Sequence, residues 1–203
     1  MYICPVCGKN LKLSRTVCRC RNGHCFDIAR SGYVNLLTTK GRNPKKAGDN
    51  TLMVKARSAF LDKDYYRPLA LKTAEIIKAL LCKNARPVII DSGCGEGYYT
   101  AFYAREIKNA EIYGIDISKS AVSHCMTRCR QKELTNVSFA VASSFELPFR
   151  ALSADLVVSA FAPVSNDEYA RVLKKGGFLV IISPAARHLY GLKSVLYDEP
   201  YEN

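Results

Sequence analysis

Long apolar runs are missing from this 203-residue chain, and none approaches the roughly 18 residues that a membrane-spanning helix requires. The first residues, Met1-Tyr-Ile-Cys-Pro5, also lack the charged and apolar zones of a secretory signal. We therefore expect a cytoplasmic protein that has no membrane partner. In that reducing compartment the nine cysteines favour free thiols or a metal site over disulfides.

Acidic residues are scarce in the N-terminal part of the chain. Residues 1–86 hold 18 Lys and Arg against 5 Asp and Glu, a net charge of 18 − 5 = +13, whereas residues 87–203 hold 12 against 13, or −1. A fold does not require such segregation, so the basic part indicates a polyanionic partner: nucleic acid first, an acidic membrane second. No amphipathic helix with an apolar face precedes the basic stretch, which favours nucleic acid.

The dinucleotide fingerprint G-x-G-x-x-G is absent as well. The stretch that comes nearest to it, Val88-Ile-Ile-Asp-Ser-Gly-Cys-Gly-Glu-Gly-Tyr-Tyr-Thr100, has glycines at alternate positions and Tyr98 in the place of the third fingerprint glycine. This spacing disfavours NAD. The stretch still predicts a buried parallel strand, a tight glycine turn and a helix, an arrangement that points backbone N–H groups at a ligand.

The pattern Asp91-x-Gly-x-Gly-x-Gly97 resembles motif I of the class I S-adenosylmethionine-dependent methyltransferases, whose loop cradles the methionine end of the cofactor. A second acid supports the resemblance. Asp116 ends the next apolar run about 20 residues after the glycine loop, where a carboxylate can accept both ribose hydroxyl protons. The alternative is a helix-capping turn followed by an unrelated acid.

Cysteine and histidine follow a metal-binding spacing at the N-terminus. Cys4, Cys7, Cys20 and His24 read C-x2-C, twelve residues, C-x3-H, which are ligand types and spacings that zinc prefers. Some 35 residues with scattered apolar side chains cannot build a sufficient core, so a structural metal would supply much of their folding free energy. Cys18 or Cys25 could replace a ligand, but Cys20 preserves the commoner geometry.

Residues 26–50 complete this module and then lead to the rest of the chain. The segment Phe26–Leu37 alternates enough to predict a short strand or a hairpin arm that closes the module. Residues 38–50 read as a linker broken by glycine and proline, which is either a solvated loop or a phosphate-binding one. Its basic residues are Lys40, Arg42, Lys45 and Lys46.

The remainder of the chain alternates between helical and strand patterns. Apolar spacing predicts packing helices over residues 51–62 and 69–81. After the strand at Val88 we expect a helix to about residue 107, a strand at 111–115, a helix at 118–132, strands at 137–141 and 155–160, and a helix end, glycine turn and fifth strand over 171–182. This βαβ alternation predicts an α/β fold with a Rossmann-like parallel sheet, preceded by a small zinc-binding domain.

Two loops at the carboxyl edge of this sheet bear on the substrate. Ser143 and Ser144 follow the third strand, where they could reach an adenine. The fourth strand ends in Phe161-Ala-Pro163, at the place where many methyltransferases of exocyclic amines carry Asn/Asp-Pro-Pro-aromatic. The missing polar residue disfavours an exocyclic amine as the methyl acceptor.

Taken together, the motifs resemble the RlmA family of large-subunit ribosomal RNA guanine-N1 methyltransferases over nearly the whole chain. Several of them lie outside the generic cofactor fold, which makes the resemblance specific. The motifs are Cys-Pro-x-Cys, His24 with Phe26-Asp27, Gly32-Tyr-Val-Asn-Leu-Leu37, Gly48-Asp49, Ala56-Arg57-x-x-Phe60-Leu61, the stretch from Asp91 to Thr100, and Arg187-His-Leu189.

The resemblance implies zinc on the quartet named above and an RNA hairpin docked on the zinc module and its basic surface. It also implies S-adenosylmethionine at the glycine loop. With the residues argued above, the expected cofactor set is Tyr66, Asp91, Gly93, Gly95, Gly97, Tyr99, Thr100, Asp116, Ser143 and His188. The expected organisation is a zinc-ribbon-like RNA-recognition module (1–37), a basic linker (38–50) and a methyltransferase domain (51–203) without the family's C-terminal strands.

Methylation of guanine N1 requires its proton to leave, so a general base or a donor to O6 would help. No catalytic base is assigned: His188, Glu96 and Asp27 are candidates, while Phe161 or Tyr66 could stack on an extruded base. Two alternatives stay open, a zinc and RNA-binding protein with a silent cofactor domain and a methyltransferase for another substrate. Because five strands would leave an apolar sheet edge bare, self-association is also expected.

Overall fold

A computed structural model of the chain describes residues 1–38 and 48–203. The four basic side chains of the predicted linker, Lys40, Arg42, Lys45 and Lys46, lie outside the described residues. In that part of the chain no helix is long and apolar enough to cross a bilayer.

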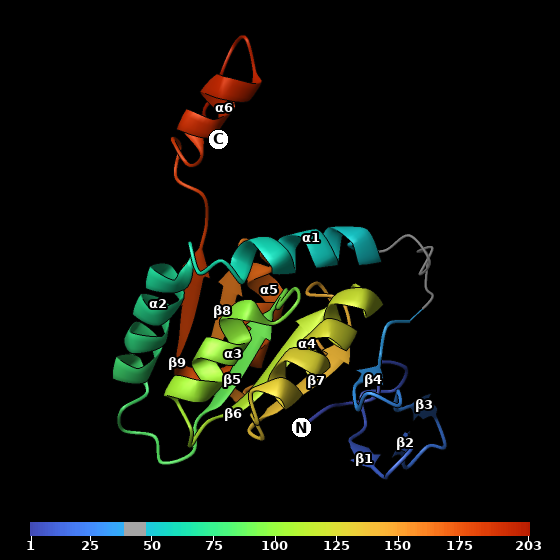
Figure 1. Cartoon of the computed structure of the whole chain (residues 1–203). Helices are drawn as coiled ribbons and strands as arrows, with labels where there is room; N and C mark the ends of the chain where they lie inside the picture. Colours follow the sequence, from blue (N-terminus) through green and yellow to red (C-terminus); the bar gives the residue numbers. More distant parts are fainter. Residues whose placement is uncertain (39–47) are drawn as a thin grey trace.

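A six-stranded sheet in the order β4-β7-β6-β5-β8-β9 forms the centre of the molecule (Figure 1), and every neighbouring pair is parallel. The predicted α/β class is confirmed. The strand order reverses at β5, which has β6 on one side and β8 on the other, and ligands bind at the carboxyl ends of strands beside such a reversal. The strands are β4 (Val34–Asn35), β5 (Val88–Ser92), β6 (Glu111–Asp116), β7 (Val137–Val141), β8 (Ala154–Ala160) and β9 (Leu173–Ile182).

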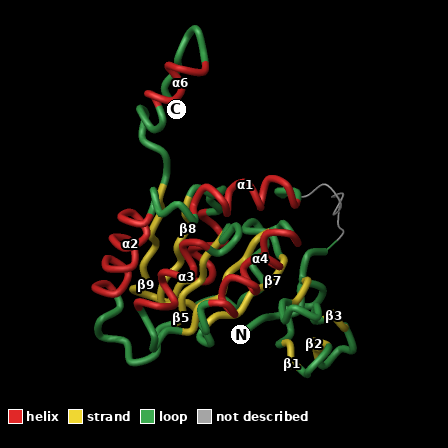
Figure 2. Tube along the Cα trace, viewed as in Figure 1, coloured by secondary structure: helices red, strands yellow, loops and turns green. Residues whose placement is uncertain are grey.

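Helices cover one face of the sheet and cross its upper edge (Figures 1 and 2). Three of them, α2 (Arg67–Leu80), α3 (Tyr98–Glu106) and α4 (Lys119–Gln131), lie against that face, and Ile77 and Tyr103 are fully buried there. The helix α1 (Thr51–Leu61) runs across the carboxyl ends of the strands. Its N-terminus is capped by Asn50, whose Oδ1 accepts hydrogen bonds from the backbone N–H groups of Leu52 and Met53.

The N-terminal module is a small antiparallel sheet of β1 (Leu11–Leu13), β2 (Val17–Cys20) and β3 (Cys25–Asp27). It shares one hydrophobic core with the other face of the main sheet, where α5 (Asn166–Val172) also packs. The ring of Tyr2 stacks on Phe149 at 5.4 Å and meets Tyr113 edge-on at 5.5 Å. Residues 142–153, which join β7 to β8, form turns instead of a crossover helix, so the module covers a face that a helix would otherwise cover.

One local prediction is confirmed in part and another is wrong. Residues 26–37 form the predicted hairpin, in which Ile28 pairs antiparallel with Val34, but Val34 and Asn35 also pair in parallel with β7 at the edge of the main sheet, where Val34 is buried in the shared core. The glycine turn expected before the fifth strand lies inside β9. There Gly176 has a φ of +76° and the pairing with β8 shifts register, so the glycines form a bulge rather than a turn.

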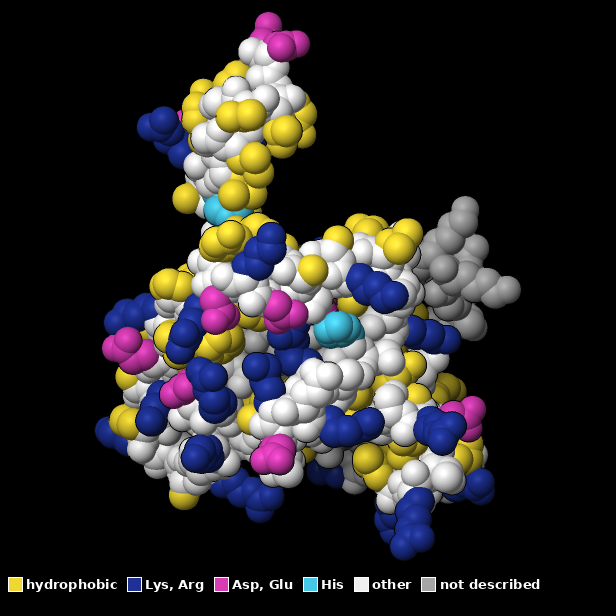
Figure 3. All heavy atoms as spheres, viewed as in Figure 1, with side chains coloured by type: hydrophobic (Ala, Val, Ile, Leu, Met, Phe, Trp, Pro, Cys, Tyr) yellow, Lys and Arg dark blue, Asp and Glu magenta, His cyan; other side chains and the backbone are white. Residues whose placement is uncertain are grey.

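The C-terminal segment leaves the sheet after β9 and projects from the body as α6 (Tyr190–Leu196), as Figures 1 and 3 show. Its apolar side chains Leu192, Val195 and Leu196 are exposed. The strand β9 is an edge strand, as predicted, and it exposes Phe178 and Ile181.

Candidate active site and metal centre

A cavity of about 710 Å³ opens at the carboxyl ends of β5, β6 and β8, beneath α1. Eight of the ten cofactor residues expected from the sequence line it: Tyr66, Asp91, Gly93, Gly95, Tyr99, Asp116, Ser143 and His188. The other two, Gly97 and Thr100, lie behind the lining. The cavity stands where an open α/β sheet binds its ligand.

The glycine loop is shaped by close packing on both sides. Gly93 has a φ of +79°, and a Cβ at this position would collide with the Cβ of Ala162. Gly97, at the N-terminus of α3, has a φ of +83°, and its Cβ would stand 3.0 Å from the Sγ of Cys125. Neither position tolerates a side chain, so these glycines fix the path of the loop.

Asp91 lies under this loop and is 1% exposed. The hydroxyl of Thr100 donates a hydrogen bond of 2.5 Å to its Oδ2, which explains why Thr100 is buried behind the cavity rather than lining it. Burial raises the pKa of Asp91 to about 7, the Thr100 hydrogen bond lowers it, and the neighbouring Asp116 and Glu96 raise it further.

We expect the free energy of unfolding to depend on pH through Asp91. An unfolded aspartate has a pKa of about 3.9, so between about pH 4 and pH 7 the folded state holds its proton more tightly, and this stabilisation is lost as the pH rises through that window. The loss amounts to roughly 4 kcal/mol for a shift of this size. Urea unfolding of the wild type and of Asp91→Asn at several pH values across this window measures the loss. If the free energy of unfolding depended on pH equally in both proteins, the dependence could not be assigned to Asp91.

Two further acids of the site differ in their partners. Asp116, at the end of β6, accepts hydrogen bonds from the backbone N–H groups of Gly95 at 3.0 Å and Ser118 at 2.8 Å. Glu96 is 3% exposed, and its Oε1 has no hydrogen-bond partner among the described residues. Burial raises the pKa of both carboxyl groups. A buried carboxylate oxygen without a donor is costly, so the site suits a ligand that brings a cation or a donor to Glu96.

The helix α1 contributes lining residues that we interpreted only as packing residues. Arg57, Phe60 and Leu61 face the cavity, and Arg57 pairs with Asp49. The guanidinium Nη1 of Arg57 lies 4.0 Å from the point where a Cβ of Gly95 would stand, so the cation is held over the glycine loop. The motifs Gly48-Asp49 and Arg57-x-x-Phe60-Leu61 stood out in the sequence, but spacing alone assigned them no role.

One buried arginine ties α1 to the glycine loop. Arg128 of α4 donates to the Oδ1 of Asp62 at 2.7 Å, to the Oγ of Ser58 at 2.9 Å and to the backbone oxygen of Glu96 at 3.3 Å. Its side chain is 7% exposed. No signal in the sequence distinguishes Arg128 from the other basic residues of α4, because its partners lie more than 30 positions away.

Aromatic rings form the other end of the cavity. Phe161 stacks on His188 with ring centroids 5.8 Å apart, and Tyr66 meets Phe161 edge-on at 6.1 Å. The hydroxyl of Tyr66 lies 3.0 Å from Nε2 of His188. Tyr99 packs on Phe161 at 6.2 Å. The cavity therefore has an acidic end at the glycine loop and an aromatic end beside it, at which Phe161 is partly exposed.

The four predicted metal ligands come together at the end of the N-terminal module, and their ligand atoms lie within 4.8 Å of one another. The Sγ atoms of Cys7 and Cys20 are 3.7 Å apart, and Nδ1 of His24 lies 3.5 Å from Sγ of Cys4 and 3.4 Å from Sγ of Cys20. Tetrahedral zinc with bonds of about 2.3 Å separates its sulfur ligands by about 3.8 Å, so the quartet fits zinc.

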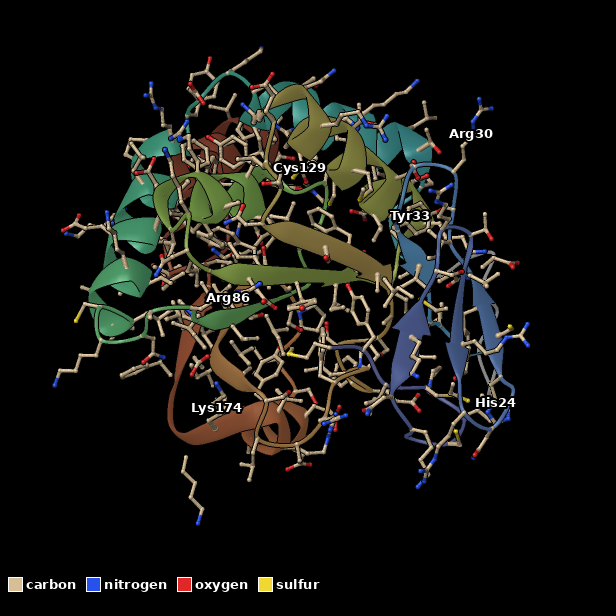
Figure 4. The ribbon with its side chains drawn as sticks, turned by 90° about the horizontal axis from the view of Figure 1, so that it is seen from below. His24, Arg30, Tyr33, Arg86, Cys129 and Lys174 are labelled. Carbon is tan, nitrogen blue, oxygen red and sulfur yellow. The ribbon has the colours of Figure 1, made fainter. Side chains whose placement is uncertain are left out.

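The two remaining cysteines of the module lie outside this cluster. Cys18 is fully buried in the shared core, and Cys25 is exposed. Figure 4 shows His24 in the module at one end of the molecule, far from Lys174 at the other.

Comparisons with known proteins match both parts of the chain. The methyltransferase domain family matches residues 83–202, and the RlmA N-terminal zinc-ribbon family matches residues 2–45. The 23S rRNA (guanine(748)-N(1))-methyltransferase of Streptomyces fradiae is 38% identical over 194 residues, which cover 95% of this chain and 66% of that protein. Relatives from Micromonospora griseorubida and Bacillus subtilis, provisionally named for the same guanine-N1 reaction, are 32% and 31% identical and are covered to 67% and 70% of their length.

The chain belongs to the RlmA family. It spans about two thirds of the length of these curated RlmA relatives. Among solved structures, a methyltransferase from Methanococcus maripaludis superposes with a TM-score of 0.59 at 20% identity, over 71% of this chain and 66% of that one. One from Aquifex aeolicus gives 0.52 at 20% identity, over 66% and 72%. These structures confirm the fold.

Within this RlmA fold the three residues considered as catalytic bases lie in different places. Glu96 and His188 line the cavity, whereas Asp27 lies on β3 of the zinc module and does not. Asp27 is therefore in no position to act on a base bound in the cavity.

Proposed function

We propose that the protein transfers a methyl group from S-adenosylmethionine to N1 of a guanine in a hairpin of large-subunit ribosomal RNA. The observation that carries the proposal is the cavity, in which an acidic glycine-loop end continues into an aromatic end open to the surface. The first end suits the cofactor and the second suits a flat base. The names of the RlmA relatives support the substrate class. Such a substrate also fits the cytoplasmic location expected from the sequence.

The cofactor would be held by residues of the acidic end. Bound there, S-adenosylmethionine supplies an electrophilic methyl group on a sulfonium. Asp116 would accept hydrogen bonds from the ribose hydroxyls, the Oε1 of Glu96 would meet the ammonium, and Arg57 would meet the carboxylate. Glycine-loop N–H groups and the start of α3 add a favourable site for a carboxylate.

The chain must also accommodate the proton on guanine N1. Of the two candidate bases in the cavity, Glu96 lies at the glycine loop and His188 lies among the rings at the mouth. His188 stacks on Phe161, and its contact with the hydroxyl of Tyr66 fixes the direction of Nε2, so neither candidate is assigned as the catalytic base.

Asp116→Ala is expected to weaken S-adenosylmethionine binding by about 1 to 3 kcal/mol, the range for losing charge-assisted hydrogen bonds. Isothermal titration measures the affinity. Asp167→Ala, which removes an exposed acid on α5 outside the cavity, is the control and should bind like the wild type. Equal affinity in both variants would show that Asp116 does not contact the cofactor.

The zinc module is proposed as the RNA-docking surface. Residues 1–38 carry six Lys and Arg against the single acid Asp27, and Figure 3 shows basic side chains on the outside of the module. Lys12 and Arg19 are exposed and stand directly opposite each other across β1 and β2. Like charges in such a pair destabilise a sheet, which supports a polyanionic partner that relieves the repulsion.

Replacing Lys12 and Arg19 by alanine is expected to move stability and binding in opposite directions. Without the repulsion the free energy of unfolding should rise by roughly 0.2 to 1 kcal/mol. Hairpin RNA should bind more weakly, and the salt dependence of log K should flatten by about 0.7 to 0.9 for each phosphate that the variant no longer neutralises. An unchanged salt slope in a filter-binding series would remove this pair from the RNA surface.

Self-association is a further part of the proposal. The edge strand β9 leaves Phe178, Leu179 and Ile181 between 38% and 46% exposed, and an unpaired strand with apolar side chains favours association. Sedimentation velocity of the chain across a concentration series measures it.

Methyl transfer from labelled S-adenosylmethionine to naked and ribosome-assembled 23S RNA tests the proposed function. We expect the wild type to incorporate labelled methyl groups into the RNA, and a variant that cannot bind S-adenosylmethionine to incorporate none. Incorporation into a small molecule and not into RNA would replace the proposed substrate, and zinc and RNA binding without any transfer would favour a silent cofactor domain.

A further inference from the structure

Phe161 stands out among the residues of the aromatic end. Its φ is +53°, a left-handed conformation that costs a bulky residue free energy. Five non-glycine residues in the described part of the chain have such a φ, and Phe161 alone among them lines the cavity. A strained aromatic residue at the mouth of a ligand site indicates a functional demand on where its ring points.

The surroundings of Phe161 hold it in this conformation. Its backbone N–H donates a hydrogen bond of 2.8 Å to the oxygen of Ile182 at the end of β9, and the following Ala162 is pressed against Gly93. The ring is braced by His188 on one side and by the edge of Tyr66, which are joined through Nε2 and the hydroxyl. Phe161 stays 39% exposed in spite of these contacts.

The position of Phe161 relates it to the reacting methyl group. The contact of Ala162 with Gly93 puts the loop after β8 directly against the glycine loop, so Phe161 lines the cavity next to the residues proposed to hold the cofactor. A base stacked on this ring would therefore lie close to a methyl group held at the glycine loop.

We propose that Phe161 is the stacking platform for the target purine, with Tyr66 and His188 acting as positioning residues that fix its ring. The proposal rests on the proposed function and names the residue that orients its substrate. A flat ring at the mouth binds a base that has left its own stack, and it provides no hydrogen bonds of its own. Recognition of N1 and O6 is then left to polar groups around the platform.

The absence of tryptophan from the chain allows a direct test. Phe161→Trp keeps a stacking ring and introduces the one tryptophan of the protein. We expect guanosine 5′-monophosphate to change its fluorescence saturably. Phe178→Trp is the matched control, because Phe178 is 38% exposed but lies on β9 outside the cavity, and its fluorescence should not respond.

Kinetics provide the second arm. Phe161→Ala should lower kcat/KM on ribosomal RNA by roughly 5- to 100-fold, the range that stacking of one base supplies, while the affinity for S-adenosylmethionine stays unchanged and Phe161→Tyr restores turnover. Unchanged kcat/KM in Phe161→Ala alongside an active wild type would overturn the proposal, as would a Phe161→Trp signal no different from the control. An inactive wild type would instead contradict the proposed function, and the nucleotide titration would still decide the platform.

Discussion

Cys4→Ser is expected to release zinc and to unfold the main sheet as well as the N-terminal module. A structural zinc site contributes on the order of 10 kcal/mol of folding free energy, comparable to the whole stability of a domain. The loss should spread because Tyr2, Leu11 and Cys18 belong to the same core as Ile115 and Val157 of the main sheet. Freeing the module would expose the part of this sheet face that α5 does not cover.

Three cysteine variants separate the metal from the packing. Cys25→Ser changes an exposed thiol outside the quartet and should keep both zinc and stability. Cys18→Ser should keep zinc but lose stability, since it places a hydroxyl in an apolar core. Metal content and thermal unfolding, followed by circular dichroism, give both quantities. A metal-free Cys4→Ser protein that unfolds at the wild-type temperature would contradict the shared core.

Gly93→Ala is expected to have the second-largest effect, and to weaken cofactor binding rather than prevent folding as a whole. The new Cβ would collide with Ala162 on the loop after β8, and a left-handed φ adds strain of its own. Overpacking costs about 1 to 3 kcal/mol and the left-handed conformation about 1 to 2 kcal/mol. Because the two loops that meet here carry the cofactor site and Phe161, their separation should weaken S-adenosylmethionine binding by at least about tenfold.

Gly176→Ala is the control that separates the steric clash at Gly93 from the strain of a left-handed backbone. Gly176 has a φ of +76°, close to the +79° of Gly93, but a Cβ there meets nothing within 4 Å. This variant should therefore lose only about 1 to 2 kcal/mol of stability and bind the cofactor like the wild type. If both variants lost the same stability and kept the same affinity, the contact between the glycine loop and Ala162 would not matter.

The parts of the fold that the sequence predicted are those set by local chemistry. The strand Val137–Val141 was expected with the bounds it has, and β5 runs into the glycine loop as its apolar run and glycines required. The four zinc ligands could be predicted from their spacing, because two close pairs of cysteine and histidine are typical of a zinc site. The family resemblance was confirmed by the comparisons.

The parts that were missed depend on contacts between distant residues. Nothing near Val34 shows that it pairs with Ala140, and the role of Arg128 follows only from its contacts with Asp62 and Glu96. The helix α1 was predicted as a helix, but its apolar spacing did not show that it lies over a cavity. The local pattern predicts a helix or a strand, but it does not show which neighbouring element that helix or strand packs against.

The central claim is that the protein methylates N1 of a guanine in 23S RNA, and mapping the methylated atom tests it most directly. N1 lies on the Watson–Crick edge of guanine, so a methyl group there blocks base pairing and stops reverse transcription. After incubation of 23S RNA with the protein and S-adenosylmethionine, nucleoside analysis should yield 1-methylguanosine, and primer extension should stop at one hairpin guanine. Methylation at another atom, or transfer by Gly93→Ala with an unchanged dependence on the S-adenosylmethionine concentration, would contradict the account.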